Sequence, residues 1–168
     1  QLALGDALAV VLSHIKGFDR DSFKLIHPAG ELGKQLMSRI SQVMITGDRI
    51  PLVDPSRPLS EVIVEMTDKS LGFTLVGSVS KIEGIVTDGD LRRVLLKWGD
   101  KLQGLTARDI MSPNPKRISS GKLALDALDT MEKYQITSLV VSDESDELLG
   151  VIHLHDLLGR GRLGLREA

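Results

Sequence analysis

The chain has 168 residues, of which 42% are hydrophobic and 26% are charged, an ordinary balance for a globular protein. Its formal net charge of −2 gives no electrostatic basis for binding nucleic acid or an anionic membrane surface. The sequence has no cysteine, which excludes disulfides and thiolate chemistry. No apolar run approaches the roughly 20 residues that a membrane-spanning helix needs. We therefore expect neither a nucleic acid nor a membrane as a partner.

The first part of the chain, residues 1–40, predicts helices and no strand. Apolar side chains recur at helical spacing over residues 4–15, and again at Leu32, Leu36 and Ile40. This stretch has too few apolar residues for a core of its own. The chain also opens with neither a start methionine nor a basic signal-peptide head. We expect residues 1–40 to be the end of a domain whose remainder is missing, in a fragment of a longer protein.

From residue 41 the sequence repeats itself. The octapeptide GIVTDGDL begins at Gly84, and GVIHLHDL begins 66 residues later at Gly150. Each copy closes a unit that predicts the same order of elements, namely a short extended segment, a helix, two strands and a second helix. The extended segments are 50–53 and 116–119, the first helices include 59–66 and 123–131, and the strands are 73–76, 84–87, 138–141 and 150–153.

These two units define the predicted fold. We predict an α/β (α+β) protein of two β-α-β-β-α units, residues 41–100 and 107–162, joined by a linker near residues 99–106. A unit of roughly 60 residues buries too little surface to be comfortable alone. The units should therefore pack together with pseudo-twofold symmetry.

The repeat resembles a tandem pair of cystathionine-β-synthase (CBS) domains, also called a Bateman module. Each unit has an early methionine, Met44 or Met111, and the signature Gly-apolar-apolar-[Ser/Thr]-x-x-Asp-apolar. The segments LGDALA (4–9) and HPAGELG (27–33) resemble the end of the sugar-isomerase (SIS) domain in the D-arabinose 5-phosphate isomerase family. That resemblance covers nearly the whole chain.

The resemblance implies a parent enzyme that interconverts D-ribulose 5-phosphate and D-arabinose 5-phosphate, the entry to Kdo and lipopolysaccharide. It also implies a cytoplasmic protein, contact with its own SIS domain, and assembly as a dimer of CBS pairs, or a tetramer for the full-length enzyme. His27 matches the position of a catalytically relevant histidine in that family, where imidazole suits proton transfer. The other acid–base groups would lie upstream, so we expect the fragment itself to be inactive.

Thr87 and Asp90 are the leading ligand-binding candidates. A carboxylate can accept hydrogen bonds from both hydroxyls of a ribose, and a hydroxyl can donate to a phosphate oxygen. By resemblance, CBS domains use this pair on nucleotides. The alternative is helix capping by Thr87 or Asp88. Capping does not explain Asp90, so a ligand role is favoured there.

Other candidates come from both units. Basic side chains that can meet a phosphate or a sugar carboxylate are Arg92, Lys116 and Arg117, whereas Arg93 reads as a solvated helix residue. The positions that the resemblance places along the cleft are Thr46, Ile50, Thr74, Thr137 and Ser138.

Unit two departs from the signature. His153 stands where unit one has Thr87, while Asp156 is retained. His153 keeps a donor and adds a charge that changes near neutral pH, so the two sites should differ. His153, His155 and Asp156 also leave a metal site open as an alternative, although they lack a metal-ligand spacing signature.

The expected ligand is a regulatory nucleotide or nucleotide sugar, and no cofactor is required. Adenine nucleotides, AMP or ATP, are the default for CBS pairs. The implied pathway leads to CMP-Kdo, and end-product feedback is a reason for its opening enzyme to bind such a nucleotide. We therefore rank CMP-Kdo or another cytidine nucleotide first. A ligand-free dimerisation scaffold remains the alternative from another class.

Overall fold

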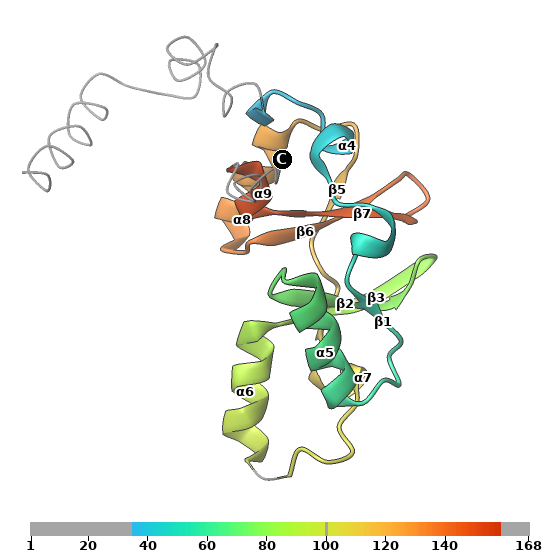
Figure 1. Cartoon of the computed structure of the whole chain (residues 1–168). Coiled ribbons are helices and arrows are strands. Elements are labelled where there is room, and N and C mark those ends of the chain that lie inside the picture. Colours follow the sequence, from blue (N-terminus) through green and yellow to red (C-terminus); the bar gives the residue numbers. More distant parts are fainter. Residues whose placement is uncertain (1–34, 100, 159–168) are drawn as a thin grey trace, which may run out of the picture.

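The computed structural model describes residues 35–99 and 101–158, which form two β-α-β-β-α units with their sheets facing one another (Figure 1). The predicted fold class and the order of elements are confirmed. The expectations for residues 1–34, including a helix over 4–15 and a role for His27, lie outside the described residues.

Unit one contains a mixed sheet in the order β1-β2-β3-β4. β1 is parallel to β2, whereas β2, β3 and β4 are antiparallel neighbours. The elements are α4 (Ile40–Val43), the 3₁₀ helix η1 (Gly47–Arg49), β1 (Leu52–Val53), α5 (Leu59–Lys69), β2 (Phe73–Ser78), β3 (Lys81–Thr87) and α6 (Asp88–Trp98).

Unit two repeats this arrangement with the sheet order β5-β6-β7. Its elements are α7 (Ala107–Ile110), β4 (Ser112–Pro113), β5 (Arg117–Ser119), α8 (Ala124–Tyr134), β6 (Ser138–Ser142), β7 (Leu148–His153) and α9 (Leu154–Leu157). The repeat extends to backbone detail, since α5 and α8 both end on a left-handed residue, Ser70 at φ 54° and Gln135 at φ 53°.

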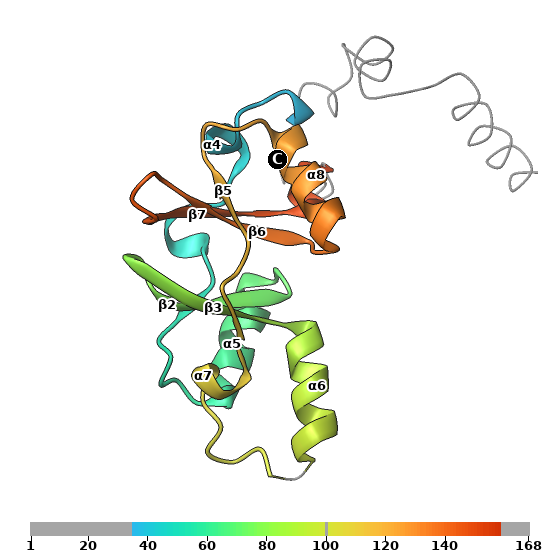
Figure 2. The same cartoon turned by 180° about the vertical axis from the view of Figure 1, so that it is seen from behind.

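The opening residues of each unit pair with the sheet of the other unit. β4 follows α7 in the chain but pairs with β3 of unit one, where Ser112 lies opposite Ile85. Reciprocally, Ile45 exchanges two backbone hydrogen bonds with Val151 of unit two, at 2.8 and 3.0 Å. In Figure 2 the chain after α7 runs from the lower unit across to β5 in the upper one. The repeat alone does not reveal this exchange.

The helix predicted on Leu32, Leu36 and Ile40 is not continuous. Residues 37–39 leave the helical path, and Arg39 forms a β-bridge with Leu123 before α4 begins at Ile40. The Arg39 side chain also donates to the carbonyl of Gly121 at 2.8 Å. Both contacts hold this segment against unit two, so long-range pairing overrides the local helical pattern.

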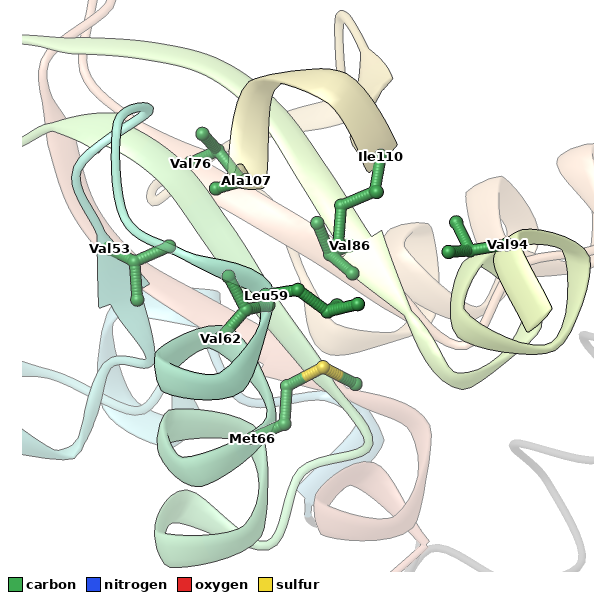
Figure 3. Close-up of a cluster of buried hydrophobic side chains, with 9 residues drawn as sticks. All are labelled: Val53, Leu59, Val62, Met66, Val76, Val86, Val94, Ala107 and Ile110. Atoms are coloured by element: carbon green, nitrogen blue, oxygen red, sulfur yellow. The ribbon is translucent and has the colours of Figure 1, made fainter. Parts of the chain in front are cut away.

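Three apolar clusters hold the molecule together. One lies under α5 and α6 in unit one and includes Val62, Met66 and Val86 (Figure 3). A second lies under α8 and α9 in unit two and takes in Ile40 from the start of the described chain. The third lies between the two sheets, which makes the pair one packed body. Its members are Ile45, Phe73, Leu75, Ile82, Val140, Leu148 and Val151.

Candidate ligand-binding cleft

A cavity of about 680 Å³ lies between the units, where the helices α6 and α9 begin. Equivalent pieces of both units line it, namely the loops that enter β2 and β6 and the strand-to-helix junctions after β3 and β7. Residues 112–116, which connect α7 with β5, form a further wall. Its volume is in the range of small-molecule pockets.

The cavity brings together half of the residues proposed from the sequence. Thr87 and Arg92 reach it from unit one, and Lys116 reaches it from the connecting segment. Thr137, Ser138 and His153 reach it from unit two. Sequence reasoning did not name five of the polar lining residues as ligand-binding candidates, namely Ser70, Asp88, Ser112, Asn114 and Gln135. Asn114 carries a signal in its Asn-Pro pair, which is typical of a turn.

Asp90 does not line this cavity. Only 5% of Asp90 is exposed, and its carboxylate is already occupied. It accepts hydrogen bonds from the Thr87 amide at 2.8 Å, from the Thr87 hydroxyl at 2.5 Å and from the Ser112 hydroxyl at 2.9 Å. Arg93 completes the set with an ion pair, and its side chain is 68% exposed, as expected for a solvated helix residue.

The pKa of Asp90 reflects this environment. Burial raises the pKa, but the hydrogen bonds from Thr87, Ser112 and Arg93 together lower it below the ordinary value of an aspartate. Thr87 caps α6 at the same time, since its hydroxyl accepts from the Asp90 amide at 3.3 Å. Capping therefore occurs, and the ribose-binding role of Asp90 stays a prediction.

Asp156 stands at the equivalent place in unit two, yet its carboxylate oxygen Oδ2 is buried with no hydrogen-bond partner among the described residues. Two replacements explain the difference. His153, in place of Thr87, makes no side-chain cap hydrogen bond to α9. Ile45, in place of Ser112, has no hydroxyl to donate. An unpartnered buried carboxylate oxygen is costly. Asp156 does not line the cavity, so its role in ligand binding stays a prediction.

The remaining candidates lie elsewhere. Thr74 is fully buried, and its hydroxyl donates to the Leu75 carbonyl at 3.4 Å. Arg117 donates to the Ile82 carbonyl at 3.1 Å and forms an ion pair with Asp146 at 3.1 Å. Arg117 thus joins the two units.

Neither Thr46 nor Ile50 borders the main cavity. Thr46 precedes η1 without a side-chain cap bond, and Ile50 packs on the cluster between the sheets. Their proposed roles in ligand binding stay predictions.

His153 and His155 lie next to one another in the cavity wall. Their ring centroids lie 5.0 Å apart in an edge-on arrangement. Burial lowers the pKa of His153 below the ordinary value, His155 lowers it further, and Asp156 partly offsets both effects. No cluster of three metal-binding side chains occurs within residues 35–99 and 101–158. The metal alternative at His153, His155 and Asp156 gains no support.

Comparison with known proteins places this cleft in a family. The model of the CBS domain matches residues 40–97 and again residues 107–162, which together make up more than half of the chain. The chain belongs to the CBS domain family. The tandem match explains the pseudo-twofold cleft, because each CBS domain supplies one strand-to-helix junction.

The curated relatives of this CBS pair include arabinose 5-phosphate isomerases. Arabinose 5-phosphate isomerase KdsD of Salmonella typhimurium is 48% identical over 161 residues, which cover 95% of this chain and 48% of that protein. The chain thus spans about half the length of the curated relatives it matches.

Two solved structures share the fold of the CBS pair. CBSX2 in complex with AMP superposes with a TM-score of 0.63 at 20% identity, over 74% of this chain and 96% of that one. The CBS pair of MJ0100 in complex with 5′-methylthioadenosine and S-adenosyl-L-methionine gives 0.64 at 17% identity, over 75% and 98%. Among the described helices of this CBS pair, none is long and apolar enough to cross a membrane.

Proposed function

We propose that this CBS pair is the regulatory, nucleotide-binding part of an arabinose 5-phosphate isomerase. The parent enzyme would interconvert D-ribulose 5-phosphate and D-arabinose 5-phosphate, on the route to Kdo and lipopolysaccharide. The observation that carries the proposal is the cavity at the two strand-to-helix junctions, where hydroxyl, carboxylate and basic groups converge. Sequence identity of 48% to an isomerase across nearly the whole chain supports the parent enzyme.

The lining of the cavity suits a nucleotide in its chemistry. Lys116 and Arg92 supply positive charge for a phosphate, and Thr87 and Ser138 supply hydroxyl groups. Asp88 can accept hydrogen bonds from sugar hydroxyls. Aliphatic side chains such as Ile136 can pack against a base, in keeping with the scarcity of aromatic residues in the sequence.

The choice of nucleotide rests on two considerations. Two solved CBS pairs of this fold hold adenine-containing ligands, AMP in one and S-adenosyl-L-methionine with methylthioadenosine in the other. Feedback from the pathway instead favours CMP-Kdo or another cytidine nucleotide, whose acidic sugar the basic lining can meet. We rank cytidine nucleotides first and AMP or ATP second.

Calorimetry on this chain tests the proposal. CMP-Kdo, CMP, AMP and ATP are titrated into the wild-type protein and into Lys116→Ala. Loss of one charge-assisted hydrogen bond should weaken binding by about 1.5 kcal/mol, roughly tenfold. Lys122→Ala is the matched control, since Lys122 lies outside the cavity. Absence of binding for all four at millimolar concentration would leave the ligand-free scaffold as the function.

Regulation is tested on the full-length enzyme. Interconversion of the two pentose phosphates is followed with and without the nucleotide that binds best. The rate should change in the wild type and change less in Lys116→Ala at the same nucleotide concentration. An unchanged rate at saturating nucleotide would show that the module binds without regulating.

A further inference from the structure

We infer that the cavity has a polarity, with the oxyanion end of a ligand against unit two, and that this end takes up a proton when the oxyanion binds. The inference deepens the proposed nucleotide function and rests on it for the natural ligand. The chemistry itself concerns any phosphate or sulfate group of double negative charge.

The two ends of the cavity are equivalent in the fold and opposite in chemistry. At the start of α6 the chain presents Thr87, Asp88 and Gly89. At the start of α9 the same three positions are His153, Leu154 and His155. The carboxylate of Asp88 repels an oxyanion at the unit-one end, where Arg92 of α6 offsets part of this repulsion. Unit two has no carboxylate at that position and carries two imidazoles.

A permanent charge reinforces the unit-two end. Lys116 leads into β5 of the unit-two sheet, and its carbonyl accepts from the amide of Val140 at 3.0 Å. The ammonium group lies 4.2 Å from the centre of the Tyr134 ring, also in unit two. Lys116 lines the cavity together with both histidines. An oxyanion held there would meet the ammonium group of Lys116 and two imidazole rings.

The groups around His153 determine its response. His155 and Asp156 face it from the same turn, and the Phe73 ring of unit one lies 6.2 Å from its ring. Ser138 is its partner across the sheet. Lys116, Arg92 and Asp88 share the cavity. His153 is half-buried beside a second imidazole. Both the burial and the neighbouring ring disfavour its cationic form in the free protein, and a bound anion would favour that form.

The direction of the effect follows from linkage. A bound oxyanion stabilises the imidazolium form, so the pKa of His153 is higher in the complex than in the free protein. A proton therefore moves from solvent to the ring on binding, and affinity rises as the pH falls from 7.5 toward 5.5. Each unit of pKa difference strengthens binding by a factor of about 10.

Sulfate is the probe, because its own charge does not change in this pH range. Binding is followed by amide NMR shifts at pH 5.5 and 7.5, with sodium chloride at equal ionic strength as the reference. We expect shifts around Lys116, His153 and His155, and affinity several-fold to about tenfold higher at pH 5.5. Lys122→Ala, outside the cavity, should behave as wild type.

Two variants separate titration from packing. His153→Thr introduces the unit-one residue, and His153→Gln keeps size and a donor without a titratable group. Both should lose most of the pH dependence. Amide shifts that sulfate causes only at other residues, or a pH dependence of sulfate affinity that persists in both variants, would overturn the inference.

A parallel titration with CMP and CMP-Kdo separates this inference from the proposed function. A pH-dependent sulfate site that ignores both nucleotides would keep the proton-linked subsite and reject nucleotide binding. A nucleotide affinity that is the same in the wild type and in His153→Thr at both pH values would keep nucleotide binding and reject the proton-linked subsite.

Discussion

Asp90 and Asp156 occupy equivalent places in the two units, and their carboxylates have opposite surroundings. Asp90 receives hydrogen bonds from Thr87 and Ser112 and an ion pair from Arg93. The Oδ2 atom of Asp156 is buried and has no partner within the described residues. The same side chain is thus fully hydrogen-bonded in unit one and only partly satisfied, within the described residues, in unit two.

The two aspartates should respond oppositely to alanine substitution. Asp90→Ala leaves the Thr87 amide and Ser112 hydroxyl without their acceptor and should lower the free energy of unfolding by about 2–4 kcal/mol. Asp156→Ala removes an unpartnered buried oxygen and should change stability by less than about 1 kcal/mol. Urea denaturation followed by circular dichroism measures both. Equal losses in the two variants would contradict the assignment.

Stability should depend on His153 even without a ligand. Because the pKa of His153 is lower in the folded chain than in the unfolded one, the unfolded state binds its proton first as the pH falls. The free energy of unfolding should therefore decrease below about pH 6.5, the ordinary histidine value. His153→Thr should flatten this part of the profile. A stability that increases on acidification through this range would show the sign to be wrong.

The glycines of the two signatures are required for different reasons. A Cβ at Gly84 would lie 2.5 Å from the Met111 sulfur, whereas a Cβ at Gly150 would lie 2.5 Å from the Ile45 carbonyl oxygen. Gly150→Ala should cost more than about 2 kcal/mol, because the backbone of Ile45 is held by two hydrogen bonds to Val151.

Double substitutions check this distinction. Met111→Ala makes room beside Gly84 and should recover part of the loss in Gly84→Ala. Met44→Ala, the equivalent change beside Gly150, should recover little in Gly150→Ala because the carbonyl contact remains. Thermal unfolding of the single and double variants gives the coupling. Equal recovery in both pairs would disprove the carbonyl explanation.

We expect the predicted homodimer to form through the helices of unit one. Ile63 and Val64 of α5 and Leu95, Leu96 and Trp98 of α6 are exposed apolar side chains. Apolar side chains of this kind are buried when a protein–protein contact covers them. Leu96, which is 89% exposed, should be replaceable by glutamate without unfolding the chain.

Sedimentation velocity tests the location. The wild type should sediment as a dimer or larger, and Leu96→Glu should shift it toward the monomer. Val79→Glu is the control, since Val79 is 52% exposed but lies in the turn between β2 and β3. A strictly monomeric wild type at high micromolar concentration would refute the prediction.

The sequence predicted much of this fold because the repeat is explicit. Helical and strand periodicities place α5, α8 and the four long strands within a few residues of their observed bounds. The exchange of Ile45 and Ser112 between units escaped prediction, because pairing across the molecule leaves no local pattern. For the same reason the periodicity through Leu36 and Ile40 predicted a helix where Arg39 bridges to Leu123.

The site was predictable in composition but not in detail. Some of the hydroxyl and basic residues expected at the cleft, such as Thr87, Lys116 and Ser138, do line the cavity, and their role in ligand binding stays a prediction. Whether a carboxylate is occupied depends on neighbours far away in sequence. Ser112 lies 22 residues from Asp90, so no motif reveals that this hydrogen bond exists.

The pairing of Ile45 with Val151 sets an order of events during synthesis. The two residues are 106 positions apart (151 − 45), so the first must wait for the last strand of unit two to leave the ribosome. At a synthesis rate of roughly 5–20 residues per second, that wait lasts about 5–20 seconds. Meanwhile Ile40, Val43 and Met44 have no apolar surface of unit two to cover them. Unit one can close its own sheet as soon as Ser112 emerges, yet the segment around Ile45 remains undocked until β7 has emerged.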